Sequence, residues 1–171
     1  PINAVRSQDV IARVTAQASR QPGLAAVVLD LMDFDGNEIY FATVPALEGK
    51  TYADAVAGFA TSSTIGLYDQ VHGVRLNPAV TTVIPSGAQI IVVAEDDSTA
   101  VYSPVTLDAG SFKPVARRAA AKAENLLVIG WSAMGRAVME NMAEIQPKGS
   151  TVHLVARTQI VDPDPFKTLD M

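Results

Sequence analysis

The sequence predicts a mixed α/β fold, in which an α+β lobe precedes the first strand–helix–strand unit of a doubly wound sheet. Short apolar segments bounded by glycine and proline turns occupy residues 24–97, with a short helical pattern among them. At residues 125–129 an apolar run leads into a small-residue turn and then a helical pattern. The 171 residues are 49% hydrophobic and 18% charged, so the chain can bury a sizeable core.

An amphipathic connector helix is expected first, within residues 1–23. Its apolar positions Val10, Ile11 and Val14 share one face, and Ser7 is the expected N-cap. The Pro-Gly pair that follows should end the helix. We expect the apolar face to mediate self-association.

The α+β lobe is expected over residues 24–97. Thr51 and Asp54 resemble a capping box, which predicts a short helix over residues 52–60. Strands are expected at residues 24–32, 38–44, 64–68, 74–76 and 88–94. The first two strands would form a hairpin, because the polar turn between them is rich in residues that tolerate positive φ.

A linker with a short basic helical part is expected over residues 98–124. In this helical part, Arg117, Arg118 and Lys122 stand in an alanine-rich stretch, which is typical of a solvated helix. A site for an anion or a lipid headgroup is the alternative.

The start of a second, incomplete lobe is expected over residues 125–171. A strand at 125–129 and a strand at 151–156 would flank one helix. The apolar face of that helix carries Met134, Val138, Met142 and Ile145.

The turn before this helix is a candidate cofactor site. A dinucleotide fingerprint needs three glycines, and Gly130 and Gly135 supply the first and the third. Ser132 replaces the second, and Arg157 stands where an acid would bind the ribose hydroxyls. These departures disfavour NAD(P), and a role for the two glycines in packing alone is the alternative.

Ser132 also stands in a Gly-x-Ser pattern, which raises the possibility of a catalytic nucleophile. Met134 occupies the place of the second glycine of a nucleophile elbow, and His153 is the only histidine downstream. We therefore expect Ser132 to cap the helix.

Two acidic groups are candidate metal sites for a hard cation such as Ca²⁺. Asp33 and Asp35 lie in the polar turn, and Asp96 and Asp97 follow the last strand of the lobe. Calcium takes six to eight oxygen ligands, so neither group suffices without backbone, water or a second subunit. Ordinary turn chemistry and a solvated strand end are the alternatives.

Charge and composition exclude several classes of partner. The net charge of −5 predicts no nucleic-acid binding. The absence of cysteine excludes disulfides and thiolate sites, and no apolar run is long enough for membrane insertion. Because the chain begins with Pro1 and has no signal segment, we expect it to be part of a longer protein.

Taken in order, several runs resemble the C-terminal lobe of a regulator-of-K⁺-conductance (RCK, TrkA-C-like) domain. These runs are residues 49–56 (GKTYADAV), 65–67 (IGL), 73–78 (GVRLNP) and 84–97 (IPSGAQIIVVAEDD). Together with residues 20–24 (RQPGL) and the segment 125–135, they are similar to the cytosolic region of Castor and Pollux cation channels and their bacterial relatives.

The resemblance implies a cytoplasmic, non-enzymatic gating module that senses a ligand. Its implied partners are copies of itself, in a homodimer or ring, and the pore-forming transmembrane part of the same protein. The second lobe would then be Rossmann-like. A fragment of a dinucleotide-binding oxidoreductase and a purely structural oligomerisation module are the alternatives.

Overall fold

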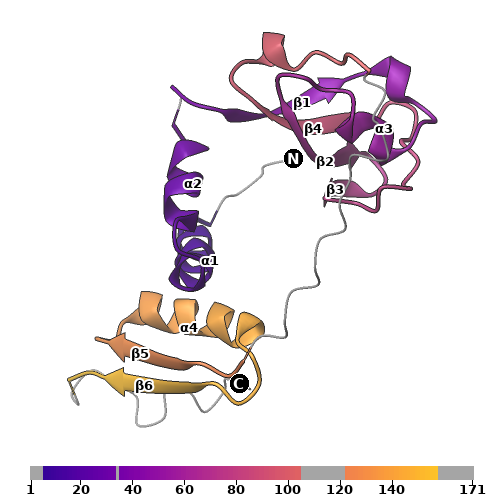
Figure 1. The fold of residues 1–171 in the computed structure, drawn as a ribbon. Coiled ribbons are helices and arrows are strands. Elements are labelled where there is room, and N and C mark those ends of the chain that lie inside the picture. Colours follow the sequence, from indigo (N-terminus) through magenta and orange to yellow (C-terminus); the bar gives the residue numbers. More distant parts are fainter. Residues whose placement is uncertain (1–5, 34, 105–121, 158–171) are drawn as a thin grey trace. The chain divides into compact units, whose positions relative to one another are not determined.

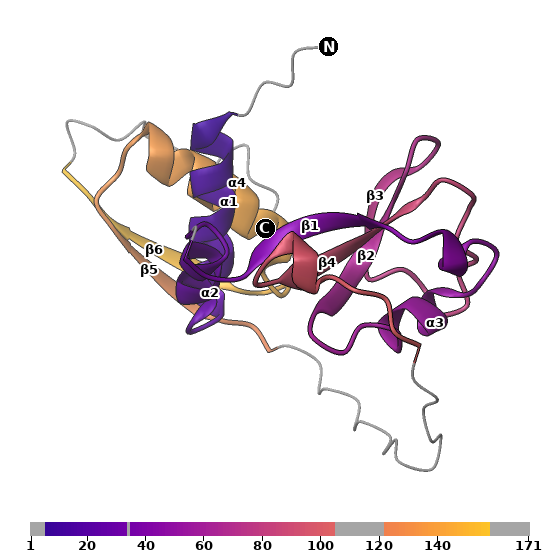
Figure 2. The same ribbon diagram turned by 90° about the horizontal axis from the view of Figure 1, so that it is seen from above.

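The computed structural model describes residues 6–33, 35–104 and 122–157 and divides the chain into two compact units. Unit 1 combines Pro1–Val28 with Ala116–Met171, and unit 2 is Leu29–Val115. In Figures 1 and 2, unit 1 consists of helices beside a two-stranded sheet, and unit 2 contains a four-stranded sheet. The expected mixed α/β class is confirmed.

Unit 1 contains the strand–helix–strand arrangement expected near the end of the chain. β5 (Asn125–Ile129) and β6 (Thr151–Val155) pair in parallel, and α4 (Ala133–Ile145) connects them. α4 lies between this two-stranded sheet and α1 (Ser7–Arg20), as Figure 1 shows. The parallel pair needs such a crossover helix, because a hairpin turn cannot join parallel strands.

The apolar face of α4 differs in part from the expected one. Met139 and Met142 are buried with Val138 packed beside them, whereas Ile145 is 38% exposed. Spacing alone therefore identified Met142 and Val138 correctly, missed Met139 and was wrong about Ile145.

α1 contacts α4 through its small residues. Ala12 and Ala16 are buried, while Val10 and Ile11 are 39% and 52% exposed. Small side chains let two helix backbones approach closely, which explains why the alanines form this contact. Ser7 is not the N-cap, because Arg6 holds that position and makes no side-chain capping bond.

The expected strand at residues 24–32 is wrong, and with it the expected hairpin. The segment forms a second helix, α2 (Leu24–Asp30), which has no buried residue. Gly23, with φ +90°, separates it from α1. A short apolar run fits a buried strand or a helix equally well, and this run gains no strand partner in the described part of the chain.

Unit 2 is built on an antiparallel sheet in the order β1-β4-β2-β3. The strands are β1 (Glu38–Thr43), β2 (Ser63–Asp69), β3 (Gly73–Leu76) and β4 (Gln89–Ala94). Two short 3₁₀ turns, η1 (Pro45–Leu47) and η2 (Asp97–Thr99), flank β1 and β4. The four strands expected after residue 37 are thus confirmed, within a residue or two at their ends.

The core of unit 2 lies between one face of this sheet and α3 (Tyr52–Val56), which stands beside the sheet in Figure 1. The Asp54 carboxylate accepts the Thr51 backbone N–H at 2.8 Å, so the expected capping interaction begins α3. The helix ends at Val56, four residues earlier than expected. The buried residues of this core are Leu47, Tyr52, Ala55, Phe59, Leu67, Ile84, Ala88, Ile90 and Val92.

Within residues 6–33, 35–104 and 122–157, every helix is too short or too polar to cross a lipid bilayer.

Candidate functional site

The turn between β5 and α4 adopts the geometry expected of a strand-to-helix turn. Gly130 has φ +86°, a conformation that favours glycine. The Ser132 hydroxyl accepts the Gly135 backbone N–H at 3.1 Å and caps α4. The capping interpretation of Ser132 is therefore confirmed, and His153 stands exposed on β6.

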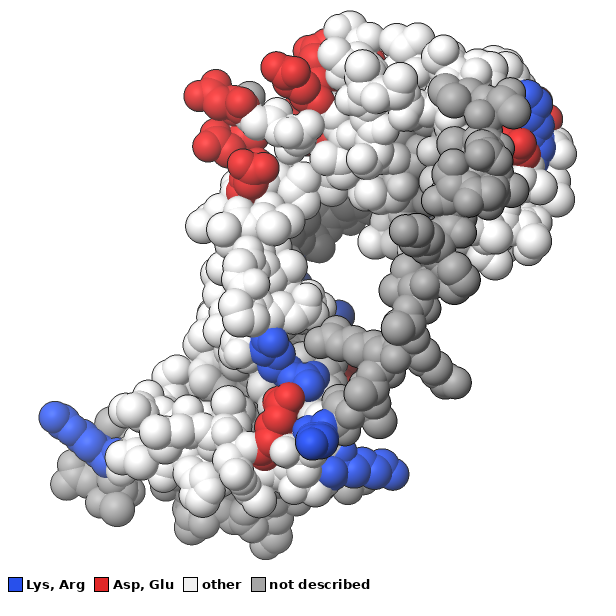
Figure 3. Space-filling model, in the orientation of Figure 1, with Lys and Arg blue, Asp and Glu red and all other residues white. Residues whose placement is uncertain are grey.

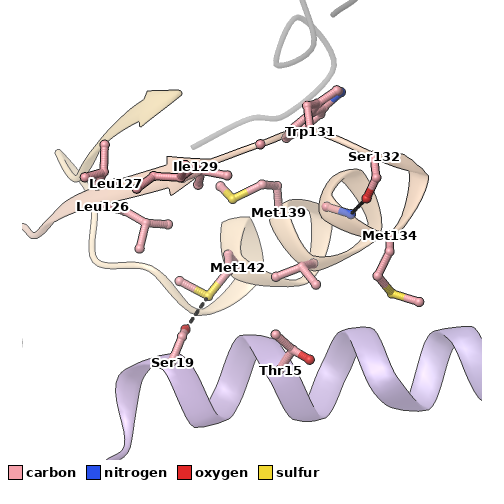
Figure 4. Close-up of a pocket in the computed structure, with 14 residues that line it drawn as sticks. Thr15, Ser19, Leu126, Leu127, Ile129, Trp131, Ser132, Met134, Met139 and Met142 are labelled. Carbon is pink, nitrogen blue, oxygen red and sulfur yellow. Dashed lines mark hydrogen bonds between the residues drawn. The ribbon is translucent and has the colours of Figure 1, made fainter. Parts of the chain in front are cut away.

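A groove of about 600 Å³ runs along β5 and α4 in unit 1 (Figure 4). Thr15 and Ser19 of α1 close one side, and the Ser19 hydroxyl lies 3.4 Å from the Met142 sulfur. The remaining lining is largely apolar, with Trp131 packed at the cluster beneath it. The lining contains no charged side chain, so it offers no counter-charge for a phosphate.

The structure brings together three of the four residues expected to bind a cofactor. Gly130, Ser132 and Gly135 line one end of the groove, while Arg157 is exposed after β6 and does not line it. A methyl group at Gly135 would make only ordinary 3.7 Å contacts, so close helix–strand packing does not require this glycine. Because Ser132 already binds the Gly135 amide, a phosphate would have to displace it, and cofactor binding stays a prediction.

The two acidic groups expected to bind a cation meet at one end of the sheet of unit 2. β1 begins at Glu38 directly opposite Ala94, the last residue of β4, so the turn before β1 and the segment after β4 are neighbours. Figure 3 shows the carboxylates gathered there without a basic side chain among them. We call this surface the acidic end; it comprises Asp30, Asp33, Asp35, Glu38, Glu95, Asp96 and Asp97.

Hydrogen bonds and mutual repulsion shape the electrostatics of the acidic end. The Tyr40 hydroxyl donates to Glu38 at 2.7 Å, which raises the pKa of Tyr40 to about 12, with the nearby Asp96 and Asp97 charges adding to the effect. Hydrogen bonds from Ser98 lower the pKa of Asp96. The lowered pKa of Asp96 favours its ionised form, which a cation site needs.

The acidic end supplies an incomplete cation site. Asp96 caps η2 by accepting the Ser98 N–H at 2.9 Å, and Asp33 accepts the Asp35 N–H at 3.4 Å. Among the described residues, no group of three or more histidine, aspartate or glutamate side chains is arranged to hold a metal ion. Calcium binding at Asp33, Asp35, Asp96 and Asp97 therefore stays a prediction that needs further oxygen ligands.

A buried carboxylate that the sequence analysis missed organises the β2–β3 turn. Asp69 is 6% exposed and accepts the backbone N–H groups of Val71 and His72 at 3.0 and 2.8 Å. Its second oxygen accepts Arg75 Nη2 at 2.7 Å, and His72 Nδ1 lies 3.0 Å from the first. His72 is a turn residue, as expected.

The bonds to Asp69 favour its charged form. The backbone N–H of His72 is the largest cause that lowers the pKa of this carboxyl. Asp69 and His72 also line a hollow of about 410 Å³ with Ser86 and Gly87. The signal in the sequence was the aspartate four residues before Gly73, since an aspartate that starts a tight turn commonly bonds the amides that follow it.

Arg117 and Arg118, which the expected linker carries with Lys122, lie outside the described residues. Lys122 is exposed just before β5. The linker and the basic group therefore stay predictions.

Comparison with known proteins places the chain in a family. A family model described as "Castor and Pollux, part of voltage-gated ion channel" matches residues 8–109. The chain is 31% identical over 154 residues to the ion channel CASTOR of Lotus japonicus, covering 84% of this chain and 17% of that protein. It is 36% identical over 107 residues to the probable ion channel POLLUX of Arabidopsis thaliana, covering 62% of this chain and 13% of that protein.

The fold is also similar to that of a solved structure, the human SLO3 gating ring. The TM-score is 0.55 at 15% sequence identity, and the match covers 87% of this chain and 34% of that one. The chain thus spans a small part of each of these larger proteins. From the match over residues 8–109 and the relatives that extend it, the chain belongs to the Castor and Pollux family.

Proposed function

We propose that this chain is a cytoplasmic regulatory segment of a cation channel, which passes ligand-driven or assembly-driven movement to a pore elsewhere in the same protein. The match of residues 8–109 to a part of a voltage-gated ion channel carries this proposal. The fold shared with a gating ring supports it. In this function the chain makes and breaks no covalent bond.

Two features of the chain suit such a role. Its described residues form two separate compact units, each with its own core cluster, so each unit can move as a body. α1 leaves Val10 and Ile11 exposed, which supports the expected self-association through this helix. In an assembly, a coupling free energy of about 1–3 kcal/mol between sites is typical and adds up over identical subunits.

The charge distribution supports a sensing role for unit 2. Residues 29–104 contain ten acids and two bases, and seven of those acids form the acidic end. A cation that bound there would relieve their mutual repulsion, so one arrangement of subunits would be favoured over another. In the longer protein, a neighbouring segment or subunit would supply the missing ligands.

Single-channel recording of the full-length protein tests the gating role. Ile11→Glu places a charge on the exposed face of α1, and Gln17→Glu places the same charge on another face of that helix as a control. We expect Ile11→Glu to change the ratio of open to closed time by about 5- to 150-fold, because coupling energies are of that size. Unitary conductance should stay unchanged in both variants.

The same recordings contain the result that would contradict the proposal. If Ile11→Glu altered unitary conductance or ion selectivity while open probability stayed constant, the segment would act on permeation rather than gating. An equal change in Gln17→Glu would show that added charge alone disturbs the channel.

A further inference from the structure

The sheet of unit 2 has a second face that is apolar and carries no charge. Residues directly opposite one another in an antiparallel sheet share a face, so the pairs Ile39–Val93, Phe41–Ile91 and Tyr68–Val74 lie opposite the core side. We call this surface the outer face; its strand residues are Ile39, Phe41, Thr43, Ser63, Gly66, Tyr68, Val74, Leu76, Gln89, Ile91 and Val93.

The outer face exposes large side chains to an unusual degree for a sheet. Ile39 and Phe41 are each 47% exposed, and Val74 and Leu76 are 55% and 64% exposed. A polar outer face is the rule for an antiparallel sheet that packs its core on one side only. A contiguous apolar patch of this kind typically marks an interaction site.

Two aromatic side chains of the outer face also contact each other. Phe41 and Tyr68 meet edge to face, with ring centroids 5.8 Å apart, across the strand between them. Ile91 on that strand is 2% exposed although α3 lies on the opposite face. Aromatic pairs of this kind are common anchors at interfaces.

We propose that the outer face is an interface between two copies of this chain, packed face to face. The excess of acids in unit 2 favours the outer face as the surface through which two copies meet. Residues 29–104 carry ten acids and two bases, so other surfaces of unit 2 would set like charges against each other in a symmetric pair. No strand residue of the outer face is charged, so two copies can meet there without that repulsion. The inference rests on the proposed self-assembly and adds a second self-association surface to the exposed face of α1.

The size of the face predicts a weak interaction. With strands about 4.8 Å apart and about 3.3 Å per residue, the four strands, which have 6, 7, 4 and 6 residues, cover about 400 Å². Two such faces bury about 800 Å², below the roughly 1,200 Å² of a stable specific complex. We therefore expect pairing in the isolated chain only at high concentration, and stronger pairing where a larger assembly holds the copies together.

Sedimentation equilibrium of the 171-residue chain tests the proposal. From about 10 μM to about 1 mM, the average mass should rise from 18.0 kDa toward that of a dimer. Leu76→Glu should keep the chain monomeric over this range. Val56→Glu is the matched control, because Val56 is 50% exposed on α3 and lies off the outer face. Thermal unfolding by circular dichroism checks that both variants fold.

Cysteine labelling gives a second readout that does not depend on the charged variants. The chain contains no cysteine, so Leu76→Cys and Val56→Cys each introduce a single thiol. Alkylation of the thiol in Leu76→Cys should slow as the chain concentration rises, while alkylation in Val56→Cys stays constant.

Four results would overturn the proposal. These are a wild-type mass of 18.0 kDa at about 1 mM, association that Leu76→Glu leaves intact, association lost only in Ile11→Glu, and protection of the Leu76→Cys thiol that is independent of concentration. The last would mean that the same chain covers the face. None of them bears on the recordings of the full-length channel, so the gating role stands or falls separately.

Discussion

Truncating one leucine on each face of the unit 2 sheet should show which face is buried, because the two variants should lose different amounts of unfolding free energy. Leu67 on β2 is fully buried, whereas Leu76 on the adjacent β3 is 64% exposed. In Leu67→Ala, the three lost carbons remove about 2 kcal/mol of transfer free energy. A residual cavity of about 40 Å³ adds about 1 kcal/mol. We expect Leu67→Ala to lower the free energy of unfolding by about 3 kcal/mol, and Leu76→Ala by less than about 1 kcal/mol.

The chain carries its own reporters for this measurement. All four tyrosines lie in unit 2 and the single tryptophan, Trp131, lies in unit 1. At low chain concentration, the tyrosine near-ultraviolet circular dichroism follows the urea unfolding of unit 2. With a slope of about 1.5 kcal/mol/M, the midpoint in Leu67→Ala should fall by about 2 M. A shift no larger than that of Leu76→Ala would refute the assignment of the two faces.

Three further predictions concern single residues. Ser132→Ala should lower the unfolding free energy of unit 1 by about 1 kcal/mol, because it removes the side-chain cap of α4. Trp131 fluorescence in urea measures this loss, and Ser132→Asp, which can still cap the helix, should retain most of the stability. The pKa of Asp69 is lowered in the folded state, so this carboxylate stabilises the fold at pH values above its ordinary pKa, and the stability is lost as the pH falls through the folded pKa. In Asp69→Asn, the urea midpoint followed by tyrosine circular dichroism should therefore fall less steeply between about pH 5 and pH 2 than in the wild type. An equally steep fall in both proteins would exclude this role. Calcium titration by calorimetry should give heat that Asp96→Ala or Asp97→Ala reduces; no heat in the wild-type chain or in the full-length protein would remove the metal proposal and leave the gating role standing.

Local signals were sufficient where one segment contains the whole interaction. The strand at β5, the turn at Gly130, the cap at Ser132 and the strand at β6 follow from short-range pattern, and each was expected within a residue of its observed place. Likewise, Thr51 and Asp54 are three residues apart, so their capping interaction is visible in the sequence. Backbone geometry over a few residues decides such features.

Features that depend on distant partners were decided only by the tertiary structure. The run after Gly23 forms α2 because no strand lies beside it among the described residues, and Met139 rather than Ile145 is buried because α1 and the two strands cover only part of α4. The sequence by itself determined the class of fold, the order of the later strands and the family resemblance. Strand pairing between β1 and β4 brought together carboxylates about sixty residues apart and set an apolar face opposite the core. Register between distant strands fixes which side chains share a surface, and that register depends on the packing of the whole unit.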